Sequence, residues 1–456
     1  MRVLRNILLA LFLVGPLAGG IGVWYVRTAA PVGSGLIAKQ LCTLIFESRL
    51  TPERARQVYF RTLFGPIERI FAHEIDTIAG TVTVRGGGAV GEASHRPGLG
   101  CTQQHPDMPA SALEPIAFDG RRPLEAIDAS ARATYFNGDA IEAALDRAFG
   151  GPPHRNTLAV AVLHKGRLIA ERYAPGVTAV TPLPGWSLAK SATVTLAGML
   201  AHQEQIAVTD RALFPQWQDP DHRADITLDM LLRMTSGIDL TENGSGLDAN
   251  SRMLFTTPDA AGFAIGRGLR AAPGTSFAYT SGSTVLAARY LTDRAGGPGP
   301  MYALIRELFD TLGMHSAVIE PDGADTFIGS SFMVASARDW AKLGQLYLNR
   351  GRWDERVLFD PSWVDYVSTL TPESGRRRYH AGFMGQRPLS VYEEHGAPPP
   401  PADTLAGHGL QNQALYVLPG ADMVIVRLGA SGRYWDSGEW QLIDDLLAAR
   451  QAEPSS

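Results

Sequence analysis

The sequence predicts an α/β fold, in which helices pack on a sheet assembled from segments that lie far apart in the chain. Two strand-like runs, 157–164 and 167–173, flank Lys165-Gly166, a pair suited to a tight hairpin turn. A second hairpin, formed by 414–417 and 423–428, lies near the C-terminus, and helical patterns fill the chain between the two. Strands at both ends of a region with helices between them indicate an α/β sandwich.

The composition is that of a folded globular protein and argues against a nucleic-acid partner. The chain has 456 residues, of which 45% are hydrophobic and 19% are charged, and its length allows two or three domains. The formal net charge is −5, and the sequence contains no dense block of lysine and arginine. Nucleic-acid binding therefore has no electrostatic support.

The first thirty residues differ from the rest and predict a membrane anchor. Arg2 and Arg5 precede an uncharged, mostly apolar stretch, 6–26, which is long enough to cross a bilayer as a helix. A cleaved signal peptide with its cleavage site at 28–30 is the alternative, but Pro31 directly after the cut disfavours cleavage. The basic residues before the span place the N-terminus inside. The rest of the chain would then lie outside the cytoplasm, on the periplasmic side of a bacterial inner membrane.

Residues 31–130 are predicted to form an accessory extension without catalytic residues. Thr51-Pro52 is a helix start with threonine as the N-cap, and 81–84 alternates as a strand ahead of a glycine run. The two cysteines of the chain, Cys42 and Cys101, both lie in this extension. An even pair in an exported chain predicts a disulfide, which would stabilise the fold by about 4 kcal/mol in the chain-entropy model. Two buried free thiols are the alternative.

The main domain is predicted over 131–456. Its first helix, 139–149, places apolar residues at i, i+4 and i+8 and is closed by a glycine. The strand that follows, 158–163, is apolar on both faces, which suits the centre of a covered sheet. A closing amphipathic helix is predicted over 439–450. Residues 372–405 contain a proline run and little periodicity, so they are predicted to form a long surface loop that acts as a lid or pocket wall.

The central chemical signal is Gly-Trp-Ser-Leu-Ala-Lys-Ser at 185–191, which opens a helix predicted over 187–202. A serine at a helix start has its hydroxyl near unsatisfied backbone N–H groups and the positive end of the helix dipole. Lys190 lies one turn beyond Ser187 on the same face, so its amine can reach that hydroxyl. No other charge occurs over 188–201, and burial would lower the lysine pKa and let the amine accept a proton. An N-cap serine beside a solvated lysine is the alternative.

A second motif, Phe-Ala-Tyr-Thr-Ser-Gly-Ser at 277–283, precedes an apolar helix predicted over 284–291. A tyrosine at this position, Tyr279, would project into a cleft and relay a proton between the nucleophile and the leaving group. A partly buried core tyrosine is the alternative.

A third motif, Gly-His-Gly-Leu at 407–410, enters the last strands. Its glycines, Gly409 included, let a strand backbone approach a substrate closely. The Leu410 N–H would then face the Ser187 N–H across a substrate carbonyl and form an oxyanion hole. His408 would bind substrate or tune the site, and a partly exposed loop histidine is the alternative.

The order of these three motifs resembles the penicillin-recognising serine hydrolases, which include class C β-lactamases, D-alanyl-D-alanine carboxypeptidases, related esterases and 6-aminohexanoate-dimer hydrolases. Two further stretches, 226–237 (ITLDMLLRMTSG) and 336–344 (SARDWAKLG), are similar to recurrent segments of that family. The resemblance runs from about 156 to 446. A serine ahead of Ala-Lys-Ser, and His-Gly where Lys-Thr-Gly is usual, make the chain most similar to the 6-aminohexanoate-dimer hydrolase branch.

The resemblance implies a β-lactamase/transpeptidase-like fold, with an antiparallel sheet flanked by helices and an all-helical subdomain. It implies acylation of Ser187, assisted by Lys190 and Tyr279, and hydrolysis of the acyl-enzyme of a small ester or amide by water, without a metal or cofactor. The chain departs from the β-lactamases in two ways. Ser281 replaces the usual asparagine that contacts substrate amides, and no lysine occupies the Lys-Thr-Gly position. Both departures argue against an efficient β-lactamase and leave esterase or amidase activity intact.

Other functions fit the sequence less well. An α/β-hydrolase needs Gly-x-Ser-x-Gly followed by an acid and a histidine, and 185–189 matches only in part. A metallohydrolase needs clustered ligands, whereas the histidines here are scattered. D-alanyl-D-alanine carboxypeptidase or β-lactamase activity is a further alternative. A non-catalytic protein that binds or senses a cell-wall fragment is the rival from another class, and three intact catalytic positions argue against it.

Overall fold

A five-stranded antiparallel sheet forms the centre of the computed structural model. The structure describes residues 2–106, 108, 110–115, 126–151, 155–218, 222–386, 388–432 and 437–452, with side chains from Gly22 onward. The strand order is β12-β13-β14-β5-β6, so the C-terminal hairpin β13–β14 adds to the earlier hairpin β5–β6 through the β14–β5 pair. Both predicted hairpins are therefore confirmed. The strands are β5 (Thr157–His164), β6 (Arg167–Tyr173), β12 (Leu405–Gly409), β13 (Gln413–Leu418) and β14 (Met423–Gly429).

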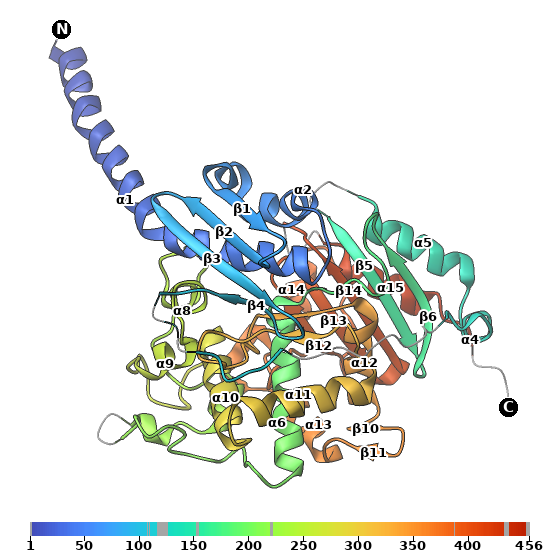
Figure 1. Cartoon of the computed structure of the whole chain (residues 1–456). Coiled ribbons are helices and arrows are strands. Elements are labelled where there is room, and N and C mark those ends of the chain that lie inside the picture. The colour runs from blue at the N-terminus through green and yellow to red at the C-terminus, as the bar shows by residue number, and fades with distance from the viewer. Residues whose placement is uncertain are drawn as a thin grey trace.

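Helices cover both faces of this sheet and create two hydrophobic layers (Figure 1). Helices α5 and α15 pack on one face, where Val160 and Val162 of β5 point, and α6 and α12 form the layer on the other, where Ala161 points. Strand β5 is buried along its whole length, which confirms a strand that is apolar on both faces. The four helices are α5 (Gly138–Phe149), α6 (Ala189–His202), α12 (Ala337–Leu348) and α15 (Glu439–Ala448).

A helical region and a second, three-stranded sheet lie between the two hairpins in sequence. In the small sheet, β7 (Leu183–Pro184) and β8 (Val318–Ile319) both pair with the central β9 (Met333–Ala335). Strand β7 leads directly into the Ser187 turn. The helices of this region, which confirm the predicted helical subdomain, are α7 (Leu228–Leu232), α8 (Ala249–Thr256), α9 (Ala260–Ile265), α10 (Ser281–Arg294), α11 (Pro298–Leu312) and α13 (Pro361–Ser368).

The N-terminal part is built around one long helix, α1 (Arg2–Phe46), whose first half projects away from the body (Figure 1). The predicted boundary at residue 30 lies inside this helix, because α1 continues into the core of the extension, where Ala30 and the following apolar residues are buried. Of the predicted span 6–26, the side chains before Gly22 lie outside the described ones. Gly22–Phe46 is long and apolar enough to cross a membrane, although 67% of its most apolar 18-residue stretch is buried within the protein.

A four-stranded antiparallel sheet packs on the buried half of α1. Its strands are β1 (Ala72–Asp76), β2 (Thr81–Gly86), β3 (Ala89–Arg96) and β4 (Gly100–Gln103), in that order. The strand predicted at 81–84 is part of β2, and Thr51 caps the short helix α2 (Pro52–Ala55) as predicted. A disulfide joins Cys42 of α1 to Cys101 of β4, with 6.0 Å between the Cα atoms, as the even cysteine count predicted.

The prediction of a surface loop over 372–405 is only partly right, because much of the segment is irregular and exposed but parts of it fold into the core. This segment contains a 3-10 turn at Pro372–Arg377 and the helix α14 (Leu389–Glu394), and it forms a bridge from Met384 to Ala406 at the edge of β12. Its aromatic residues Tyr379, Phe383 and Tyr392 are buried. The backbone is irregular and leaves no periodic pattern in the sequence, yet these rings fill space in the core.

Candidate active site

Ser187 lies in the turn between strand β7 of the small sheet and helix α6. The Gly185 N–H donates to the Met333 carbonyl at 2.8 Å, which ties the turn to β9. Trp186 then adopts a left-handed φ of 51°, and a 3-10 turn, Trp186–Leu188, precedes α6. The predicted helix start at Ser187 is present, with a 3-10 first turn. The Ser187 side chain is partly exposed, so the hydroxyl is accessible from the surface.

Lys190 is the buried centre of the hydrogen bonds around Ser187. Its Nζ donates to the Ser187 Oγ at 3.1 Å, the Ser281 Oγ at 3.2 Å and the Ser330 carbonyl at 2.9 Å. The side chain is only 3% exposed. Burial lowers the Lys190 pKa to about 8, and the negative charge of Glu242 opposes this shift. A fraction of the amine is therefore neutral at pH 7, as proton transfer from serine requires.

Tyr279 sits over the same lysine. Its ring centroid lies 5.0 Å from the Lys190 Nζ. Burial raises the Tyr279 pKa, the Glu242 charge raises it further, and interaction with the Ser187 side chain and the Arg377 charge lower it. The hydroxyl is therefore a phenol at neutral pH, and a phenol carries the proton that a leaving group needs.

The glycines of β12 bring that strand against the Ser187 turn. A Cβ on Gly407 would lie 3.1 Å from the Ser191 Oγ, and a Cβ on Gly409 would lie 2.1 Å from the Gly185 carbonyl oxygen. Only glycine permits this approach. Leu410 follows directly, in the turn between β12 and β13, with its side chain 51% exposed. The backbone of the Gly-His-Gly-Leu motif thus lies beside the nucleophile turn, as the sequence suggested.

The His408 ring points the other way. Alternation along β12 puts it on the opposite face of the sheet from Gly407, where it packs against Tyr416 and Trp440 at centroid distances of 5.4 and 5.9 Å. Its Nδ1 lies 4.0 Å from the Glu439 carboxylate. The prediction of a substrate contact from this ring does not match its position, because a strand presents successive side chains to opposite faces.

Two groups of the site, the Glu242 carboxylate and the Ser330 carbonyl, lie outside the three sequence motifs. The Glu242 Oε2 accepts from the Ser281 N–H at 2.5 Å, at the start of α10, and no other hydrogen bond to Glu242 occurs among the described residues. Ser330 acts through its backbone carbonyl, so its residue type reveals nothing. Ser281 itself is 1% exposed and holds Lys190, which places the predicted substrate-binding residue beneath the surface of the site.

Replacing Glu242 by glutamine is expected to move the acid limb of the acylation rate to lower pH. The amide keeps an acceptor for the Ser281 N–H but removes the charge that raises the Lys190 pKa. More amine is then neutral below pH 8, so the rate there rises about threefold. The measurement is the labelling rate with a fluorophosphonate probe across pH, with the exposed Glu204→Gln as control. An unchanged limb, or one moved upward, would contradict the assignment.

Comparison with known proteins supports the same fold. The family model described as Beta-lactamase matches residues 144–438, more than half of the chain. A Bacillus anthracis protein assigned as a 6-aminohexanoate-dimer hydrolase has a TM-score of 0.54 and 21% identity, over 72% of this chain and 87% of that one. A penicillin-binding protein homologue from Caulobacter crescentus gives 0.54 and 16% over 68% and 97%. A β-lactamase/D-alanine carboxypeptidase from Pseudomonas syringae gives 0.52 and 16% over 69% and 99%.

At these identities the solved structures are similar to this chain in fold, and no curated protein matches the sequence. The antiparallel sheet covered by helices on both faces, with a helical subdomain beside it, is β-lactamase/transpeptidase-like. The family match spans the β5 strand, the Ser187 turn and the β12–β14 hairpins. The chain therefore belongs to the beta-lactamase family and is a serine hydrolase.

Proposed function

We propose that Ser187 is the nucleophile of an acyl-transfer site that hydrolyses a small ester or amide. The observation that carries this proposal is the lysine beside it. The buried Lys190 amine lies 3.1 Å from the Ser187 Oγ, and its pKa is lowered to about 8. A buried lysine of a merely structural kind would need a carboxylate partner, whereas this one is held by two hydroxyls and a carbonyl.

The reaction follows from the positions of these groups. The Ser187 oxygen attacks the substrate carbonyl as its proton passes to the neutral Lys190 amine. The Ser187 and Leu410 N–H groups stabilise the negative charge on the carbonyl oxygen. The Tyr279 phenol gives its proton to the leaving alcohol or amine and regains one from the protonated Lys190. A water molecule then attacks the acyl-enzyme by the same route in reverse and releases the acid.

The substrate class follows from what the site lacks. Gly407 and Gly409 face the nucleophile turn, so no lysine side chain of β12 is available there to bind a substrate carboxylate. Ser281 is buried and bonded to Lys190. Short esters and linear amides, as in the named 6-aminohexanoate-dimer hydrolase, fit these features better than β-lactams do.

The N-terminal helix is proposed to anchor the enzyme, with residues 1–30 as the anchor, 31–130 as the extension and 131–456 as the hydrolase domain on the periplasmic side of an inner membrane. Trp24 and Tyr25 are 59% and 43% exposed at the point where α1 leaves the body. Aromatic residues of this kind are typical of the membrane–water interface.

A panel of substrates tests the proposed reaction. The full-length protein in detergent is assayed with short-chain esters, a linear amide dimer, a D-amino-acid peptide and a β-lactam. Hydrolysis of the esters or the amide dimer, with little turnover of the β-lactam, is expected. Turnover of the D-amino-acid peptide or the β-lactam above all others would replace the proposed substrate class by carboxypeptidase or β-lactamase activity. Binding without turnover of any of them would point to a sensor instead.

A further inference from the structure

The N-terminal extension holds one carboxylate of the hydrolase domain in a buried, fully bonded position. Glu320, which directly follows β8, pairs with Lys39 of α1, and each side chain is 1% exposed. The Glu320 Oε1 accepts from the Thr43 hydroxyl at 2.7 Å and from the Cys101 N–H at 2.8 Å. The disulfide at Cys101 fixes β4 to α1. All three donors to Glu320 therefore belong to one cross-linked unit.

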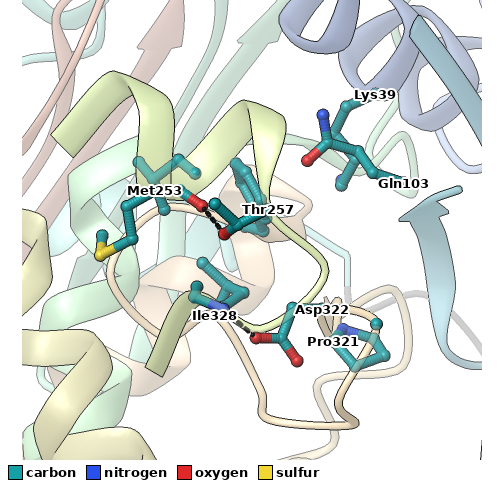
Figure 2. Close-up of a pocket in the computed structure, with 11 residues that line it drawn as sticks. Lys39, Gln103, Met253, Thr257, Pro321, Asp322 and Ile328 are labelled. Carbon is teal, nitrogen blue, oxygen red and sulfur yellow. Dashed lines mark hydrogen bonds between the residues drawn. The ribbon is translucent and has the colours of Figure 1, made fainter. Parts of the chain in front are cut away.

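The surface around this ion pair is closely packed. Figure 2 shows Lys39 and Gln103 of the extension on one side of a small cavity, with Asp322 and Ile328 of the hydrolase domain across it. The cavity holds about 10 Å³, room for about one water molecule. A Cβ on Gly100 would lie 2.5 Å from the Glu320 side chain, so only glycine fits at this point of β4. A contact this tight transmits displacement rather than absorbing it.

The segment that begins at Glu320 ends at the active site. The Glu320 N–H donates to the Phe332 carbonyl at 2.8 Å, and its own carbonyl accepts from the Ile328 N–H at 3.0 Å, which closes 320–332 into a loop. Within this loop the Ser330 carbonyl accepts from the Lys190 Nζ at 2.9 Å. One turn along α6, Thr193 donates to the Gly329 carbonyl at 2.9 Å. The loop is thus bonded to the extension through Glu320 and to Lys190 through the Ser330 carbonyl.

We propose that the disulfide-linked extension positions the active-site lysine, with Glu320 as the positioning residue that acts through the 320–332 loop and the Ser330 carbonyl. The inference rests on the proposed function, in which Lys190 takes the Ser187 proton. The extension is then part of the catalytic apparatus rather than an accessory. Enzyme whose Cys42–Cys101 bond is reduced acylates more slowly at neutral pH than the oxidised form.

The expected effect has a defined sign. Burial is the largest cause of the lowered Lys190 pKa, so a loosened loop that admits water raises that pKa toward its usual value. The acid limb of the acylation rate then moves to higher pH, and the rate recovers above the limb. Damage to the fold alone would lower the rate equally at every pH. The groups that face Lys190 are Ser187, Tyr279, Ser281, Glu242 and the Ser330 carbonyl, and Glu320→Gln changes the chemical identity of none of them.

The test is the fluorophosphonate labelling rate of the full-length protein from about pH 6 to about pH 10, which needs no knowledge of the natural substrate. Three forms are compared with wild type: Glu320→Gln, Cys42→Ser/Cys101→Ser, and wild type reduced under native conditions. Each is expected to shift the acid limb upward by about one pH unit, a loss of about tenfold in rate below the limb. Glu171→Gln, which breaks the partly buried Arg338–Glu171 pair at the far edge of the sheet, should leave the limb in place.

The outcomes separate the two proposals. Wild type that does not label at all would overturn the proposed function. If wild type labels with an acid limb and the folded variants show the limb at the same pH, only the positioning role of Glu320 is overturned. If near-ultraviolet circular dichroism shows that Glu320→Gln is unfolded, the reduced wild type decides the question, with the double serine variant under the same reductant as the control that should not respond.

Discussion

Replacing Ser187 by alanine is expected to reduce ester hydrolysis by at least about 10⁴-fold and to abolish labelling by a fluorophosphonate probe. The reason is that the acyl-enzyme forms on the Ser187 Oγ, whereas the Ser281 hydroxyl, which also accepts from the Lys190 amine, is buried. Substrate binding should persist, since the Ser187 backbone N–H is unchanged. The measurement is the hydrolysis rate of a short-chain ester together with covalent labelling of the purified protein.

Ser191→Ala is the matched control for this variant. Ser191 lies one turn further along α6, and its hydroxyl donates to the Gly382 carbonyl at 3.0 Å rather than to Lys190. It is buried, so the control removes a hydrogen bond of the same helix without touching the nucleophile. Ser191→Ala should keep most of the activity. Equal labelling of wild type and Ser187→Ala would rule out the assignment of the nucleophile and return the chain to the class of binding proteins.

Replacing Lys190 by arginine is expected to lower the acylation rate by about 10³-fold even though the positive charge is kept. A guanidinium does not lose its proton at any pH that the protein tolerates, so it cannot take the Ser187 proton. Lysine with a pKa of about 8 can, and its neutral fraction grows as the pH rises through 8. The wild-type rate should therefore show an acid limb near pH 8, and the limb should be missing in Lys190→Arg.

Lys190→Met serves as the second arm of the same experiment. Methionine fills a similar volume in the buried position and carries no charge, which removes the need for the carbonyl and hydroxyl partners of the lysine. If the lysine acts as a base, both variants lose activity to a similar extent. If it acts only as a fixed positive charge near the carbonyl oxygen, Lys190→Arg stays active and Lys190→Met does not, and the base assignment is wrong.

Much of the architecture could be predicted because it depends on short-range patterns. The apolar run of β5 is buried along its whole length, and α5 ends at its glycine, as their residues required. Ser187 and Lys190 share one face because the 3-10 turn that holds Ser187 runs directly into α6, and residues three apart lie one turn apart. The even cysteine count in an exported chain sufficed for the disulfide. Each of these features is decided within one element or by chemistry that the residue types carry.

Other features escaped prediction because side-chain direction and backbone groups decide them. His408 carried a plausible polar group next to two glycines, but the pleat of β12 turns its ring toward Trp440 and away from Ser187. The segment 372–405 lacks periodicity, yet Tyr379 and Phe383 fill the core. Glu242 entered the site from a loop without a motif, since its contact is to the Ser281 backbone.

The sequence by itself determined the elements, the nucleophile motif and the order of the three motifs that indicate a serine hydrolase. The tertiary structure alone decided the environment of the lysine. The Ser330 carbonyl lies 140 positions from Lys190 along the chain, and Lys39 lies 281 positions from Glu320. Spacing along a chain predicts contacts within a turn of helix or across a hairpin. Burial, and with it the pKa of the proposed base, depends on which distant segments pack together, and no local pattern records that.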